Sequence, residues 1–180
     1  GRNLHDLYSE AYTPWEWHEQ LFAVAKEEGL ECFSSPFDPT SVELLEKLNV
    51  PAYKIASFEI TDIPLIELVA SKGKPIIIST GIAELEDIEL AIEACERMGN
   101  ENIAILKCTS SYPAPIEEAN MIMVKDFAER FNMIVGLSDH TIGSTAPVVA
   151  TCFGARIIEK HFILDRSIGG PDASFSMNEA

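Results

Sequence analysis

Two histidines at the ends of neighbouring apolar runs are the residues that point most directly to chemistry. His140 follows the run "VGLSD", and His161 comes 21 residues later in "IIEKHF". If these runs are adjacent parallel strands, the two imidazoles can lie close together and bind one divalent metal, leaving positions open for water or a substrate. Two imidazoles with oxygen ligands suit manganese, iron or zinc equally well. Either histidine alone could also be an ordinary hydrogen-bonded loop residue.

The segment around His140 also contains a serine and an aspartate, which raises the alternative of a nucleophilic triad. Ser138 and His140 share one side of an extended strand, whereas Asp139 points to the other side. A triad needs all three side chains in one chain of hydrogen bonds, and the sequence has no GxSxG turn. The triad is therefore disfavoured, and we expect Asp139 to orient the loop.

A lysine inside an apolar run is the second chemical feature. Lys54 lies in "YKIASFE", where burial of its charge is costly unless an anion pairs with it. It can pair with a carboxylate, bind an anionic ligand or form a Schiff base. Hydroxyls, backbone amides and one lysine can together form a phosphate pocket. Serines recur at the ends of the apolar runs, at Ser35, Ser57, Ser79, Ser110 and Ser138.

The elements that must position these residues alternate between short apolar runs and amphipathic stretches. We expect strands at residues 30–34, 52–57, 75–80, 103–108, 133–137 and 155–162, and helices at 16–28, 39–48, 64–72, 84–98, 120–131 and 144–153. This alternation is typical of βαβ units and a parallel sheet. An open doubly wound sheet and a (β/α) barrel both fit. Polar residues end every expected strand, which favours the barrel, because its strand ends all meet at one mouth.

The number of strands sets the expected extent of the barrel. A complete (β/α)8 TIM barrel has eight strands and about 250 residues, whereas this chain offers six expected strands in 180 residues. We therefore expect residues 1–180 to form a single domain, an incomplete barrel of about six βα units that lacks the first two strands.

Composition restricts the partners and the compartment. The chain is 47% hydrophobic and 23% charged, as in soluble globular domains, and its net charge of −16 argues against nucleic acid or an anionic membrane as a partner. Its sequence contains neither a membrane-length apolar run nor a signal-peptide core near residue 1. The four cysteines are widely spaced and form no CxxC pair. We expect a cytoplasmic protein without disulfides.

The ordered motifs "SSPFD", "PAYKIASFE", "GKPIIISTG", "LKCTSSYPAP", "GLSDHT", "IIEKHF" and "GGPDASFS" resemble the sialic acid synthase family and span nearly all the chain from Glu31 onward. The variants "YTPWEW", Phe58 and Phe175 are most similar to the pseudaminic acid synthase branch. The resemblance implies a TIM-barrel transferase that condenses phosphoenolpyruvate with an acylated amino sugar and releases phosphate. For this branch the sugar would be a 2,4-diacetamido-2,4,6-trideoxy-altrose.

The resemblance also implies roles for the residues above. His140 and His161 match the ligands of a divalent metal, usually Mn2+, that polarises the sugar aldehyde. Lys54 matches a lysine that binds phosphoenolpyruvate. The hydroxyl or amide positions around that lysine correspond to Ser35, Ser57, Ser79, Ser110 and Ser138.

Three further residues match the catalytic machinery of the family. Glu59 matches the acid that handles the water attacking the reacting carbon, and Asp172 matches the acid near the developing sugar hydroxyl. Tyr112 would line the sugar side of the site. Asp165 lies before the same Gly-Pro loop as Asp172, where an aspartate is also common as a turn residue.

Complete members of the family also have opening strands and a small C-terminal antifreeze-like domain, whose arginine reaches into the site of a partner subunit. The resemblance thus implies a homodimer for the full-length protein, with both of those regions absent from this chain. Three alternatives stay open: an N-acetylneuraminate or legionaminate synthase, a Schiff-base aldolase acting through Lys54, and a carbohydrate-binding domain that retains no metal.

Overall fold

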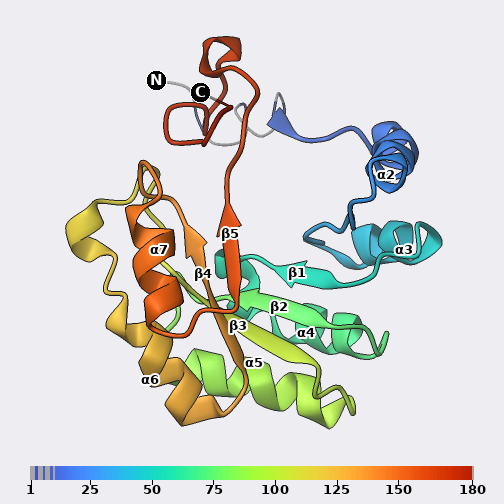
Figure 1. Cartoon of the computed structure of the whole chain (residues 1–180). Coiled ribbons are helices and arrows are strands. Elements are labelled where there is room, and N and C mark those ends of the chain that lie inside the picture. The colour runs from blue at the N-terminus through green and yellow to red at the C-terminus, as the bar shows by residue number, and fades with distance from the viewer. Residues whose placement is uncertain (1–2, 4–5, 7–8, 10, 180) are drawn as a thin grey trace.

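The computed structural model describes residues 3, 6, 9 and 11–179, and it contains a sheet of five parallel strands in chain order. The strands are β1 (Tyr53–Ile55), β2 (Ile76–Ser79), β3 (Ile103–Cys108), β4 (Ile134–Asp139) and β5 (Ile157–Lys160). Each strand pairs with the next along the chain, and the sheet curls (Figure 1). The carboxyl ends of the strands therefore converge.

Helices alternate with the strands. They are α2 (His18–Glu27), α3 (Pro39–Lys47), α4 (Ile63–Ala70), α5 (Leu85–Arg97), α6 (Ile122–Phe131) and α7 (Thr145–Cys152), with short 3-10 helices η1 (Trp15–Trp17), η2 (Ser57–Thr61), η3 (Ile116–Glu118) and η4 (Arg166–Ile168). Each α-helix begins and ends within two residues of its expected bounds. In the part of the chain that the structure describes, no helix is both long and apolar enough to cross a membrane.

Strand order and helix placement distinguish the two architectures that the sequence left open. A doubly wound sheet reverses its strand order at a switch point and has helices on both faces. Here the order is sequential, and α4 to α7 lie along the outside of the curled sheet (Figure 1). This is the wall of a (β/α) barrel, so the predicted fold class is confirmed.

Residues 30–34 were expected to form a strand, and this prediction was wrong. The backbone N–H of Lys54 donates to the carbonyl of Ser34 at 3.3 Å, but the described residues show no ladder there. Leu30 is 66% exposed and Phe33 is 40% exposed. Little burial therefore offsets the entropy cost of ordering this segment as a strand.

The helix starts follow from capping residues in the sequence. The Asp38 carboxylate accepts a hydrogen bond from the backbone N–H of Ser41 at 2.8 Å, and Pro39 occupies the first turn of α3. At α4, the Asp62 carboxylate accepts from the N–H of Leu65 at 3.1 Å. Each cap satisfies an N–H group that the helix itself leaves unpaired.

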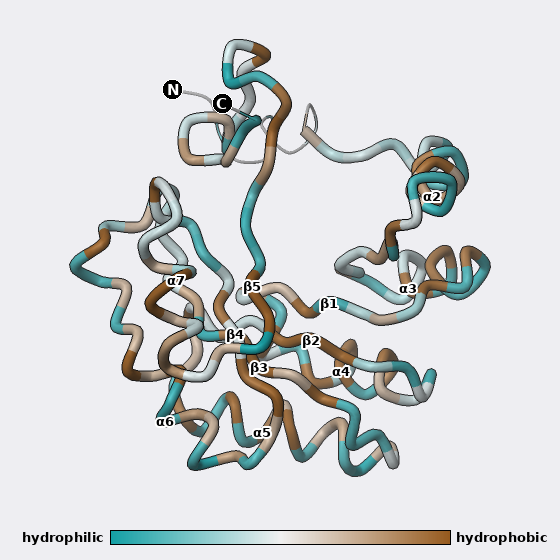
Figure 2. Tube along the Cα trace, in the orientation of Figure 1, coloured by the Kyte–Doolittle hydropathy of each residue, from teal (hydrophilic) through white to brown (hydrophobic). Residues whose placement is uncertain are grey.

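Side-chain alternation divides the sheet into two faces with different composition. The outer face packs on the helices through fully buried apolar side chains, including Ile55, Ile78, Ile105 and Leu137. Burial of each such side chain contributes about 1.5–3 kcal/mol. Figure 2 shows hydrophobic stretches in the strands, interrupted by hydrophilic residues. The inner face instead carries Lys54, Ser79 and Ser138 at the strand ends.

Gly136 allows β4 to fit between its neighbours just before the polar end of that strand. A Cβ atom at this position would lie 2.3 Å from the carbonyl oxygen of Ile157 and 2.6 Å from a methyl carbon of Leu106. Because one of these neighbours is backbone of β5, a side-chain rotation cannot relieve the clash. Glycine here sets the close approach of β3, β4 and β5.

We predict that Gly136→Ala lowers the free energy of unfolding by about 1–3 kcal/mol, the usual cost of overpacking. Urea denaturation measures the change. Glu89→Ala on the exposed side of α5 is the control, with an expected change within about 0.5 kcal/mol. An alanine variant at position 136 as stable as the wild type would contradict the close strand approach.

Candidate active site

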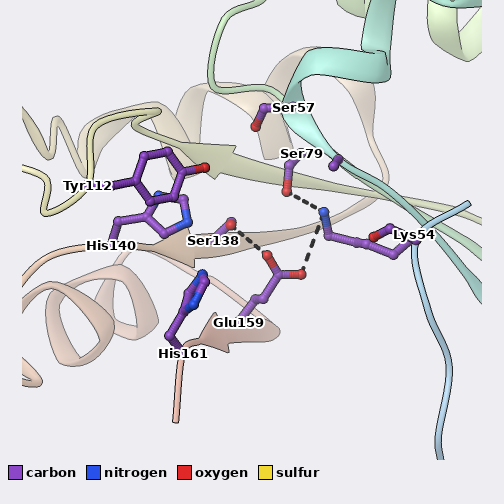
Figure 3. A pocket seen from close by; sticks show the side chains of 10 residues that line it. Lys54, Ser57, Ser79, Tyr112, Ser138, His140, Glu159 and His161 are labelled. Atoms are coloured by element: carbon purple, nitrogen blue, oxygen red, sulfur yellow. Dashed lines mark hydrogen bonds and ion pairs between the residues drawn. The ribbon is translucent and has the colours of Figure 1, made fainter. Parts of the chain in front are cut away.

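The strand ends enclose a cavity of about 210 Å³ on the inner side of the sheet. It is lined by Ser35, Lys54, Ala56, Ser57, Ser79, Tyr112, Ser138, His140, Glu159 and His161. Eight of these are residues that the sequence predicted for the site. In Figure 3, Lys54 enters from one side, the two imidazoles lie at the other, and Ser138 and Glu159 lie between them.

Lys54 forms the cationic end of the cavity. Its Nζ donates to Ser79 Oγ at 2.7 Å and to the carbonyl of Ile55 at 3.0 Å, and it lies 3.6 Å from Glu159 Oε2. Burial lowers the pKa of Lys54, and the nearby Glu159 carboxylate opposes this effect. The acceptors favour the ammonium form, which is the form that binds anions.

Two serine hydroxyls converge beside this end because residue 81 is a glycine. The backbone N–H of Gly81 donates to Ser57 Oγ at 3.0 Å. A Cβ on Gly81 would lie 2.1 Å from Ser110 Oγ and 2.9 Å from Ser57 Oγ. Ser110 Oγ is buried and has no hydrogen-bond partner among the described residues, so it retains a donor for a ligand.

His140 and His161 form the other end of the cavity, with ring centroids 5.3 Å apart. His140 Nδ1 lies 3.0 Å from the carbonyl oxygen of Thr109, and His161 Nδ1 lies 3.5 Å from Asp172 Oδ2. Because these oxygens act as acceptors, each Nδ1 is assigned the hydrogen, which leaves each Nε2 lone pair available. Histidines that bind metals are commonly held in this way.

The imidazoles thus fit a divalent metal through two nitrogen ligands. Among the described residues, no group of three or more histidine, cysteine, aspartate or glutamate side chains is placed to hold a metal ion. Further ligands would therefore come from outside that set, such as water or substrate oxygen atoms, which is the arrangement of an open catalytic site rather than a closed structural one.

The pKa values of the two imidazoles are shifted in opposite directions. Burial lowers the pKa of His140, but hydrogen bonds with Cys108 and Thr109 outweigh it, so the net pKa is raised. Burial lowers the pKa of His161, and the carboxylate of Asp172 only partly opposes this. Since a metal binds neutral imidazole, protons compete for His140 more strongly than for His161.

Aromatic side chains hold the imidazoles in place. The Tyr112 ring lies 4.2 Å from the His140 ring, and Phe175 lies 5.0 Å from His161 and 6.0 Å from His140, measured between centroids. Phe175 is 2% exposed. In the sequence, Phe175 was notable only for the family resemblance. Its packing on the imidazoles depends on the path of the loop that carries it, which the sequence does not predict.

Glu159 links Ser138 to Lys54 and was not among the predicted site residues. Its Oε1 accepts a hydrogen bond from Ser138 Oγ at 2.6 Å, while its Oε2 faces Lys54. Strand alternation already places Glu159 on the same face as His161. This two-residue alternation of side chains along the strand was the signal that could have identified Glu159 as a site residue.

Three predicted residues lie beside the cavity rather than in its lining. Ser110 contacts the Gly81 region, and Asp172 lies beside the ring of His161. Glu59, in η2, has a buried Oε2 without a hydrogen-bond partner among the described residues, and burial raises the pKa of this carboxyl group. A carboxyl group in this state is suited to hold and transfer a proton.

The chain is similar to known proteins that are longer than it is. The chain is 52% identical to the pseudaminic acid synthase of Helicobacter pylori over 176 residues, which cover 98% of this chain and 52% of that protein. The corresponding values for the pseudaminic acid synthase of Campylobacter jejuni serotype O:2 are 48% over 177 residues, 98% and 52%. The chain therefore spans about half the length of these curated relatives.

A solved structure agrees with the sequence comparison. The crystal structure of the N-acetylneuraminic acid (sialic acid) synthetase of Leptospira borgpetersenii serovar Hardjo-bovis, in complex with citrate, superimposes with a TM-score of 0.92 at 31% identity. The match covers 96% of this chain and 60% of that one. Since residues 1–180 also match the NeuB family throughout, the chain belongs to the NeuB family.

Proposed function

We propose that the protein carrying this chain condenses phosphoenolpyruvate with 2,4-diacetamido-2,4,6-trideoxy-altrose, yielding pseudaminic acid and phosphate for surface-glycan biosynthesis in bacteria or archaea. The observation that carries this proposal is one cavity with two chemically different ends, a buried lysine among serines and a pair of imidazoles. The identity of 48–52% to proteins named pseudaminic acid synthase supports this sugar over the neuraminate and legionaminate alternatives.

The lysine end is proposed to bind phosphoenolpyruvate. Its phosphate and carboxylate groups need cations and hydroxyl or amide donors, which this end can supply. The groups assigned to it are Lys54 with Ser35, Ser57, Ser79, Ser110 and Ser138. Lys54 then acts as an anion binder, and its three acceptors in the structure support that role better than a Schiff base.

The imidazole end is proposed to hold a divalent metal, which we take to be Mn2+, through His140 and His161. When bound, such a metal supplies Lewis-acid polarisation of the sugar aldehyde. Thr109 and Asp172 contact the two Nδ1 atoms, so each imidazole would bind the metal through its Nε2 atom. Tyr112, packed on His140, would line the sugar side.

Proton transfers are assigned to two carboxyl groups. Glu59 would handle the water that attacks the reacting carbon, and the raised pKa of its buried carboxyl group supports this role. Asp172 would act near the developing sugar hydroxyl. Glu159 would hold Ser138 and Lys54 in fixed positions between the two substrates.

We also propose that the protein works in the cytoplasm as a homodimer, without nucleic acid or membrane partners. The four cysteines are free thiols, as expected in a reducing compartment. The net charge of −16 disfavours binding to polyanions.

We expect the complete protein that carries this chain to release phosphate from phosphoenolpyruvate only when both manganese and the altrose-type sugar are present. A colorimetric phosphate assay compares this sugar with N-acetylmannosamine, with and without a chelator. Phosphate release with N-acetylmannosamine but not with the altrose-type sugar would instead support a neuraminate synthase. Release with neither sugar would contradict it.

Lys54→Met is predicted to lower kcat/KM for phosphoenolpyruvate roughly 10- to 100-fold, because the charge-assisted hydrogen bonds lost are worth about 1.5–3 kcal/mol. Lys47→Met, on the exposed side of α3, is the matched control and should leave kcat/KM unchanged. Borohydride in the presence of pyruvate should trap no adduct on Lys54. A trapped adduct would instead support the Schiff-base aldolase.

A further inference from the structure

A buried ion pair lies on the opposite face of the strands from the two imidazoles. Lys160 Nζ lies 2.6 Å from Asp139 Oδ2, and the two side chains are 8% and 2% exposed. Asp139 and Lys160 are register partners on β4 and β5. Each directly precedes a histidine of the candidate metal site, Asp139 before His140 and Lys160 before His161.

The pair also fixes the backbone beyond His140. The Asp139 carboxylate accepts hydrogen bonds from the backbone N–H and the hydroxyl of Thr141, at 3.0 Å and 3.1 Å. Lys160 Nζ donates to the carbonyl oxygen of Thr141 at 2.6 Å. His140 therefore lies between two residues that a single charged group of β5 holds.

We propose that the Asp139–Lys160 ion pair positions His140 and His161 for metal binding, an inference that rests on the proposed function of the imidazole end. The pair does not reach the cavity and acts only through the two histidines that follow its members. By locking the strand ends in register, it holds the rings at their separation of 5.3 Å before a metal binds. Asp139 and Lys160 are thus positioning residues.

This role explains why a charged pair stands at the ends of β4 and β5 on a sheet face that is largely apolar, although Lys107 of β3 is also buried there. A buried ion pair adds little stability over well-packed apolar residues, but it can specify one arrangement of the elements that carry it. Here the arrangement it specifies is the register of the two strand ends that meet at the imidazoles.

The test measures the manganese dissociation constant by titration calorimetry in the complete protein that carries this chain. Lys160→Met keeps the length of the stem but removes the charge, and we expect it to raise the dissociation constant about 10- to 100-fold, as for other groups that orient metal ligands. Lys160→Arg, which retains the charge, should recover part of this loss. The affinity for phosphoenolpyruvate should stay within about twofold, because Lys160 has no contact with that end of the cavity.

Lys74→Met is the matched control. Lys74 Nζ lies 2.7 Å from Glu46 Oε1, so this variant also breaks a lysine–carboxylate pair, but one whose lysine precedes β2 and is not next to either histidine. Its manganese affinity should equal that of the wild type. If Lys160→Met does not fold, the double variant Asp139→Asn with Lys160→Met avoids a lone buried charge and should show the same loss of affinity.

A second readout does not depend on metal. In the metal-free protein, histidine-selective labelling should give a nuclear Overhauser contact between the rings of His140 and His161, which Lys160→Met weakens. Unchanged ring contact and unchanged manganese affinity in a folded variant would overturn the positioning role. A wild-type protein with the ring contact but no manganese binding would contradict the proposed metal site, and the ring contact in the variant would then decide the positioning role alone.

Discussion

Successive side chains of a β-strand point to opposite faces, and at the ends of β4 and β5 this alternation separates the side chains of the cavity from those of the outer layer. Ser138 and Glu159 face the cavity, whereas Asp139 and Lys160 pair on the outer face. Both sets depend on one register between the strands. A slip by a single residue would exchange the two faces and move the polar groups of the cavity into the outer layer.

The close packing of the sheet makes this register possible. Gly136 lets the backbone of β5 approach β4, and apolar side chains on the outer face of the sheet pack against the helices. Within this frame, Glu159 accepts a hydrogen bond from Ser138 through one carboxylate oxygen and faces Lys54 with the other. The arrangement brings a buried lysine and two imidazoles into one small space. The proposed function uses them to bind an anion and a metal, in a chain whose net charge of −16 would otherwise repel anionic substrates.

Much of this could be predicted from the sequence, because apolar periodicity and polar strand ends are local signals. They predicted the helices to within two residues, the barrel, and seven residues of the cavity lining, whereas the eighth, Tyr112, came only from the family resemblance. Residues 30–34 show where local signals are insufficient, since an apolar run becomes a strand only when a neighbour buries it. Glu159 and Phe175 could not be assigned from residue type alone, because their roles depend on which groups from distant segments lie opposite them.

The central claim is that the lysine end and the imidazole end serve one reaction in one cavity. Electron–nuclear double resonance on the complete manganese-loaded protein tests this most directly, with phosphoenolpyruvate bound and its phosphorus as the reporting nucleus. Our account predicts a hyperfine coupling between manganese and that phosphorus, which disappears when His140 and His161 are replaced by alanine. Bound phosphoenolpyruvate with no coupling to bound manganese would contradict it.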